Sequence, residues 1–171
     1  DYTDQRLVQR YNADLANTLG NLLNRSLTMA HKYRAGRLAR TTLPCGPAPA
    51  EHIRAYTAAM DEFRIHAALE SALELAVACN QFIDAKKPWL LAKDVGQGPR
   101  LDGVLYYLAE SLRIIAVLIA PVLPNTAAGI FAQLHWTGSL ALEEANWGGL
   151  PDGHVVGEPT PLCPRIETAG E

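Results

Sequence analysis

The feature that most restricts the fold is a helical repeat of apolar residues along the first long segment, from about residue 4 to residue 33. Apolar side chains recur there at steps of three and four, which is the spacing of one face of an α-helix: Leu7, Tyr11, Leu15, Leu19, Leu22 and Leu23. The opposite face is polar and carries Asn17, Asn21, Asn24, Arg25 and Thr28. The pattern predicts a long amphipathic helix.

Four further segments have helical character. Pro88 ends one of them, and Pro121 and Pro124 interrupt another, because proline removes a backbone donor and cannot continue a helix. The predicted helices span about 50–64, 65–86, 101–120 and 124–134, and a loop rich in Gly and Pro precedes the first of them. No stretch alternates like a strand of a sheet. The sequence predicts an all-α, antiparallel bundle of about five helices.

Residues 135–171 differ from the bundle predicted for residues 1–134. They contain six glycines and four prolines and show no helical period. We expect an extended, mostly irregular tail, with room for a short strand or two, that packs on the bundle or on a neighbouring catalytic domain. Trp136 and Trp147 have no basic neighbours, and we interpret them as packing anchors of this tail.

Composition excludes several functional classes. A chain of 171 residues with 49% hydrophobic and 19% charged residues suits one globular domain, not a disordered chain. The longest apolar run, 114–123, is too short to cross a bilayer, so no membrane partner is expected. Three dispersed cysteines without CxxC spacing indicate free thiols in a reducing, cytoplasmic compartment. HExxH, GxSxG, GxGxxG and P-loop motifs are absent from the sequence, so we expect no catalytic centre, metal or nucleotide in this chain.

Charge is distributed unevenly, although the formal net charge is only −3. No Asp or Glu occurs between residues 15 and 50, whereas Arg25, Lys32, Arg34, Arg37 and Arg40 all lie in that stretch. Such a locally positive field attracts nucleic-acid phosphates. We therefore take Lys32, Arg34 and Arg37 as candidate phosphate contacts; the alternative is a solvated basic face.

The polar face of the first helix contains one candidate recognition pair. Asn21 and Arg25 are four residues apart, so their side chains lie side by side on a helix. Asparagine offers a donor and an acceptor, and arginine offers a planar fork of donors, which suits base edges and phosphates. Gly20 nearby costs about 1 kcal/mol in a helix interior. The alternative is a network that ties two helices of the bundle together.

A second candidate follows the predicted end of the third helix. Trp89 comes directly after Pro88, and Lys86, Lys87 and Lys93 flank the pair. An exposed indole stacks on a nucleobase, which contributes about 1–3 kcal/mol per base, and nearby ammonium groups attract phosphates. The alternative is that Trp89 plugs the end of the bundle, because large aromatic side chains are mostly buried.

Taken in order, these segments resemble the anticodon-binding domain of methionyl-tRNA synthetases. The resemblance covers nearly the whole chain, and sister class I synthetases share the bundle without this pairing of motifs. It rests on the stretches RYNADLAN at 10–17 with LGNLLNR at 19–25, ACNQFID at 78–84, PWLLAKD at 88–94, APVLP at 120–124, and GEPTPL at 157–162 with PRI at 164–166.

The resemblance implies a role for each candidate. In the family, the Asn and Arg of the NLxxR stretch contact anticodon bases, and these fall on Asn21 and Arg25. The tryptophan of the Pro-Trp pair stacks with an anticodon base, which implies this role for Trp89 beside Pro88. The implied partner is the CAU anticodon arm of methionine transfer RNA, and no DNA partner is expected.

The resemblance also implies what lies elsewhere. The full enzyme is an ATP-dependent methionine–tRNA ligase, whose ATP, magnesium and methionine bind a Rossmann-type domain that precedes this one. Its HIGH-like and KMSKS-like motifs do not occur in this sequence. We therefore expect an isolated domain or C-terminal fragment, non-catalytic and without cofactor, whose second partner is that catalytic domain.

Two other functions compete with anticodon recognition. A helical module of synthetase descent that docks on proteins would bind through an apolar surface, so its affinity would depend little on salt. A self-contained enzyme would turn over ATP and methionine by itself. RNA binding through the acid-free stretch predicts instead an affinity that falls steeply with salt.

Overall fold

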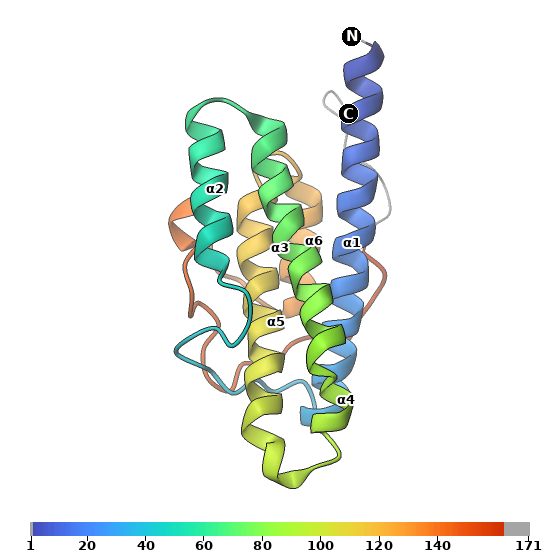
Figure 1. Cartoon of the computed structure of the whole chain (residues 1–171), viewed down its shortest axis with the longest axis vertical. Coiled ribbons are helices and arrows are strands. Elements are labelled where there is room, and N and C mark those ends of the chain that lie inside the picture. The colour runs from blue at the N-terminus through green and yellow to red at the C-terminus, as the bar shows by residue number, and fades with distance from the viewer. Residues whose placement is uncertain (1, 163–171) are drawn as a thin grey trace.

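The computed structural model describes residues 2–162, and the described chain consists of helices joined by loops (Figure 1). It contains the α-helices α1 (Tyr2–Arg34), α2 (Pro49–Asp61), α3 (Ile65–Lys86), α4 (Pro88–Leu91), α5 (Gly98–Ile119) and α6 (Pro124–Leu134), and the short 3₁₀ helices η1 (Val95–Gln97) and η2 (Leu142–Glu144). The predicted all-α bundle is confirmed, because five of these six α-helices are substantial.

Helix α5 forms the centre of the bundle (Figure 1). Every side chain from Val104 to Ile119 is buried, so this helix is covered on all sides. A helix that buries its whole circumference needs other helices around it. Helices α1, α2, α3, α4 and α6 all contact α5, and together they supply that cover.

The apolar stripe of α1 faces this core. Leu15, Leu19, Leu22 and Leu23 are fully buried, as predicted, whereas the side chains of the first two members of the stripe lie outside the described part. Consecutive helices α2 and α3 run in opposite directions, but α1 and α3 run in the same direction (Figure 1). The parallel pair arises because α2 and the loop before it lie between them in the sequence.

The end of α2 and a short helix after α3 differ from the prediction. Helix α2 was expected to reach Arg64, but it ends at Asp61, and Phe63 takes a left-handed conformation with φ of +57° that breaks the helix. Lys87 does the same after α3, with φ of +49°. The short helix α4 follows at once, and it was not predicted. Pro88 begins it, because a proline lacks only a donor that the first helical position does not use.

The segment after α6 runs back over the bundle and joins the loop that follows α1. The Leu38 N–H donates to the His154 carbonyl at 2.8 Å, and the Val156 N–H donates to the Gly36 carbonyl at 2.9 Å. Within residues 2–162 this pairing amounts to one isolated bridge and no strand. Trp136 and Trp147 pack against the core, which confirms their interpretation as anchors. Cys163 and the PRI stretch lie outside the described residues.

A buried ion pair fastens this segment to α5. Glu110 and Arg113 are fully buried, and the guanidinium donates two hydrogen bonds of 2.8 Å to the carboxylate. The remaining capacity of both groups is used by the backbone of the returning segment. The carboxylate accepts from the N–H groups of Gly148, Gly149 and Leu150, and the guanidinium donates to the carbonyls of Glu144 and Asn146. Every charge in this cluster is therefore compensated.

Candidate nucleic-acid interface

The side chains of Asn21 and Arg25 point towards α3. There they contact Asn80 and Asp84, which are also four residues apart. The Asn21 amide donates to the Asn80 Oδ1 at 3.3 Å, and Arg25 donates to the same oxygen at 3.3 Å. The other terminal nitrogen of Arg25 forms an ion pair of 2.6 Å with Asp84. The pair on α1 and the pair on α3 have the same four-residue spacing. They meet in the same order because α1 and α3 run in the same direction. The network that we considered as the alternative to base recognition is therefore present.

This network remains accessible to a ligand. The side chains of Arg25 and Asp84 are 28% and 68% exposed, and Asn21 is exposed as well. The network forms the floor of an open groove of about 430 Å³ between α1 and α3. The groove is lined by Asn17, Thr18, Asn21, Arg25, Val77, Asn80, Gln81 and Asp84. Carboxamide, guanidinium and carboxylate groups thus line one surface that a flat polar ring can reach.

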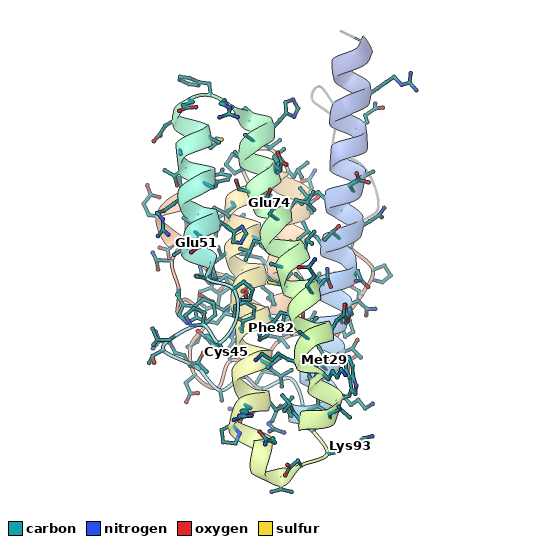
Figure 2. The ribbon with its side chains drawn as sticks, viewed as in Figure 1. Met29, Cys45, Glu51, Glu74, Phe82 and Lys93 are labelled. Carbon is teal, nitrogen blue, oxygen red and sulfur yellow. The ribbon has the colours of Figure 1, made fainter. Side chains whose placement is uncertain are left out.

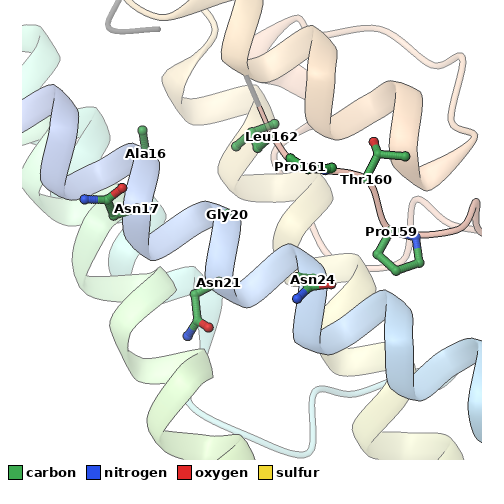
Figure 3. A pocket seen from close by; sticks show the side chains of 9 residues that line it. All are labelled: Ala16, Asn17, Gly20, Asn21, Asn24, Pro159, Thr160, Pro161 and Leu162. Carbon is green, nitrogen blue, oxygen red and sulfur yellow. The ribbon is translucent and has the colours of Figure 1, made fainter. Parts of the chain in front are cut away.

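A second cavity, of about 420 Å³, lies on the other side of Asn21 (Figure 3). Helix α1 contributes Asn17, Gly20, Asn21 and Asn24, and the stretch 159–162 of the returning segment forms the facing wall. Gly20 faces that wall, and a Cβ at this position would lie 3.9 Å from the Leu162 Cβ, in ordinary van der Waals contact. The glycine and the asparagines, which weaken α1 locally, thus all line this surface.

Trp89 is not a buried plug. Its side chain is 41% exposed, whereas the neighbouring Pro88 is buried and anchors α4 against the bundle. Trp89 stands directly beyond the end of α3, the helix that carries Asn80 and Asp84. It lines neither of the two cavities at Asn21. The structure thus brings Asn21 and Arg25 together and leaves the indole as a separate exposed platform.

The six candidate phosphate contacts fall into two groups. Arg34 pairs with Asp102 at 2.6 Å, and Arg37 donates to the Gly153 carbonyl at 3.3 Å, so both hold parts of this chain together. Lys86, Lys87 and Lys93 are exposed around α4, and Lys32 is exposed near the end of α1. Lys93 marks the α4 end of the bundle in Figure 2. The phosphate role of all six stays a prediction.

Sequence reasoning did not identify Asn80 and Asp84 as the partners of the pair on α1. The signal was present, because Asn80 and Asp84 repeat the four-residue spacing of Asn21 and Arg25. Which two helices are neighbours, and in which direction they run, cannot be read from spacing alone. The pairing therefore required the three-dimensional arrangement.

No group of three or more His, Cys, Asp or Glu side chains that could hold a metal ion occurs within the described range 2–162. Over the same residues, no helix is long and apolar enough to cross a membrane.

Comparison with known proteins identifies the family. The profile of the anticodon-binding domain of tRNA ligases matches residues 50–152. The chain belongs to this family. Its family domain therefore includes α2 to α6, with Trp89, and begins after the helix that carries Asn21 and Arg25.

Longer matches cover α1 as well. The chain is 39% identical over 183 residues to a methionine–tRNA ligase of Bacillus subtilis and 38% identical over 180 residues to one of Caldanaerobacter subterraneus. Each match covers 99% of this chain but only 27% and 28% of the relatives. The apo methionyl-tRNA synthetase of Mycobacterium tuberculosis superposes with a TM-score of 0.75 at 30% identity, over 97% of this chain and 35% of that one. The resemblance drawn from the motifs is confirmed.

Proposed function

We propose that this anticodon-binding domain reads the CAU anticodon of methionine transfer RNA for a methionine–tRNA ligase. The supporting observation is the solvent-accessible Asn21–Arg25 pair, which lies in an open groove of a chain whose relatives are methionine–tRNA ligases. Unpaired loop bases are commonly recognised by hydrogen bonds to their edges and by stacking on aromatic rings. Asn21 and Arg25 supply the first kind of contact, and Trp89, held by Pro88, supplies the second.

The network on α3 does not prevent this role. Both side chains of the Arg25–Asp84 pair reach solvent, Arg25 at 28% and Asp84 at 68% exposure, and ion pairs in contact with solvent contribute only about 0–1 kcal/mol. A base that hydrogen-bonds to Arg25 or Asn21 therefore replaces partners whose loss costs little. Until a base arrives, Asn80 and Asp84 hold the two side chains in one orientation, which lowers the entropy lost on binding.

We assign the other steps of the ligase reaction to the part of the enzyme that this chain does not cover, since the chain spans only 27% and 28% of two relatives. Methionine activation, with ATP and magnesium, belongs to the catalytic domain of the ligase, and this domain contributes RNA recognition in the cytoplasm. The exposed lysines Lys32, Lys86, Lys87 and Lys93, and to a smaller extent Arg34 and Arg37, attract phosphates of the anticodon arm.

The test is binding of hairpins with the anticodon stem-loop sequence, measured by fluorescence anisotropy with the full 171-residue chain. One hairpin carries CAU, and three controls each change one anticodon base. We expect the CAU hairpin to bind most tightly, and the affinity to fall steeply as salt is raised. Equal affinity for all four hairpins contradicts anticodon reading. Binding that is insensitive to salt favours a docking module instead.

A further inference from the structure

A third cavity, of about 500 Å³, lies on the side of α3 that faces the loop after α1. It is bounded by that loop, the last turn of α3, α4 and the first turn of α5, and its lining includes Thr41, Cys45, Lys86, Leu91, Arg100 and Gly103. Figure 2 shows Cys45 in the loop beside the half of α3 that carries Phe82. Asn21 and Arg25 do not line it.

The charged side chains that line this cavity are both positive. Lys86 and Arg100 are its charged lining residues, and no carboxylate lines it. Neither cation forms an ion pair within the described part of the chain. Arg34, by contrast, is neutralised by Asp102. Two cations that share a concave surface without a counter-charge create a site for an anion.

Two further observations agree with an anion at this place. Arg100 lies in the first turn of α5, a helix of 22 residues, and the positive end of a helix dipole favours negative charge. Partial burial raises the pKa of the Cys45 thiol, and a backbone hydrogen bond and the Lys86 ammonium, which lines the same cavity, oppose this shift. The remaining lining includes the apolar side chains of Leu91 and Val104.

The position of the cavity relative to Trp89 indicates the source of the anion. Leu91 lines the cavity and belongs to the same four-residue helix as Trp89. Trp89 and Leu91 lie two positions apart and therefore point to different sides of this helix. An RNA strand that stacks a base on Trp89 and continues around α4 brings a phosphate further along the strand to this cavity. We propose that the cavity binds such a phosphate group of the RNA backbone, held by Arg100 together with Lys86. This inference rests on the function proposed above and extends it to a residue, Arg100, that the motifs did not indicate.

The first test compares Arg100→Gln with Arg64→Gln in the same hairpin assay. Arg64 is exposed at the turn between α2 and α3, at the opposite end of the bundle from α4, so its variant removes an equal charge elsewhere (Figure 1). We expect Arg100→Gln to weaken binding of all four hairpins by the same factor, roughly three- to tenfold, and to lower the salt slope by about 1. Arg64→Gln should leave both quantities unchanged.

The second test uses Cys45 as a reporter of occupancy. Alkylation by iodoacetamide is followed by mass spectrometry in a Cys163→Ser background, and the buried Cys79 serves as the unreactive internal control. We expect the CAU hairpin to slow alkylation of Cys45 severalfold, and Arg100→Gln to abolish most of this protection. Inorganic phosphate and adenosine monophosphate are tested as separate protecting ligands.

The outcomes distinguish this inference from the function on which it rests. If the hairpins are discriminated but Arg100→Gln changes neither affinity, salt slope nor protection, the phosphate site is wrong and anticodon reading stands. If no hairpin binds but phosphate or adenosine monophosphate protects Cys45, the RNA-backbone assignment is overturned in favour of a free phosphorylated ligand, and anticodon reading also fails. If nothing binds or protects, both proposals fail.

Discussion

Two clusters in this protein are built from the same chemical parts but differ in burial. In α5, Glu110 and Arg113 have side-chain exposures of 0% and 1%, and backbone groups of the returning segment use their remaining hydrogen-bonding capacity. Between α1 and α3, Arg25 and Asp84 are 28% and 68% exposed, and their network consists of side chains next to solvent. Both clusters combine a guanidinium, a carboxylate and amide groups.

The difference shows which cluster can serve recognition. Removing one member of a buried ion pair leaves an uncompensated charge and costs about 3–5 kcal/mol, whereas an exposed pair contributes about 0–1 kcal/mol. A ligand cannot displace partners in the first cluster without unfolding the segment that they hold. In the second, exchange of partners is inexpensive. Burial, not residue type, therefore separates the structural cluster from the candidate binding cluster.

The largest expected effect is on the buried cluster. Glu110→Ala leaves the buried Arg113 without its carboxylate and leaves the N–H groups of Gly148, Gly149 and Leu150 without an acceptor. We expect the free energy of unfolding to fall by about 3–5 kcal/mol, measured by urea denaturation. Glu70→Ala on the exposed face of α3 is the control and should change it by less than about 0.5 kcal/mol. A loss below 1 kcal/mol at Glu110 would remove the contrast between the clusters.

A smaller effect is expected from titration inside the core. Burial raises the pKa of Cys79 to about 11, although hydrogen bonds with Ser111 and Tyr107 act in the opposite direction. Since the folded pKa lies above the ordinary value of 9.0, the unfolded chain loses this proton first. The contribution is complete below pH 9 and is lost as the pH rises to about 11, by about 2–3 kcal/mol in total.

Comparison with Cys79→Ser isolates this contribution, because serine keeps a hydroxyl but does not titrate in this range. Urea denaturation of both proteins between pH 8 and pH 11, under reducing conditions, gives the difference in their unfolding free energies. We expect that difference to shift against the wild-type chain as the pH rises. Two curves that remain parallel would show that the thiol is not desolvated in the folded state.

Sequence reasoning predicted most of the fold because the helices carry strong local signals. The apolar stripe ending at Leu23 indicated α1, and the bounds of α3 and α6 match the predicted spans of about 65–86 and about 124–134. Helix α4 was missed because a four-residue helix has no period to detect. The hydrogen bonds to the Glu110 carboxylate were missed because they come from backbone groups about forty positions away, which no local pattern encodes.

The candidate site was predictable only in its parts. Asn21, Arg25 and Trp89 were selected by residue type and by family resemblance. Their accessibility depends on packing, and the position of Trp89 also depends on the left-handed Lys87, which redirects the chain between α3 and α4. A lysine in this conformation leaves no signature in the sequence. Arg100 becomes a candidate contact only in three dimensions, because the first turn of α5 and α4 line the same cavity.

Trp89 tests whether the exposed region serves binding rather than stability. Trp89→Ala should weaken binding of the CAU hairpin by about 1–3 kcal/mol, through loss of base stacking, with little change in unfolding free energy because the ring is 41% exposed. The matched control is Trp147→Ala, which removes an indole packed edge-on against Tyr106. It should lower stability but leave the RNA affinity of the folded protein unchanged. If Trp89→Ala instead lowers the unfolding free energy and leaves the RNA affinity of the folded protein unchanged, Trp89 has a structural role.

The smallest expected effect is at the exposed pair itself. A double-mutant cycle with Asp84→Asn and Arg25→Gln isolates the coupling free energy between the two side chains, measured by urea denaturation. We expect a coupling below about 1 kcal/mol that disappears at high salt, because both groups contact solvent and their attraction is screened. A coupling above about 2 kcal/mol that persists in salt would make this pair as fixed as the buried one. Arg25 could then not exchange Asp84 for a base, and recognition would have to rest on Asn21 and Trp89.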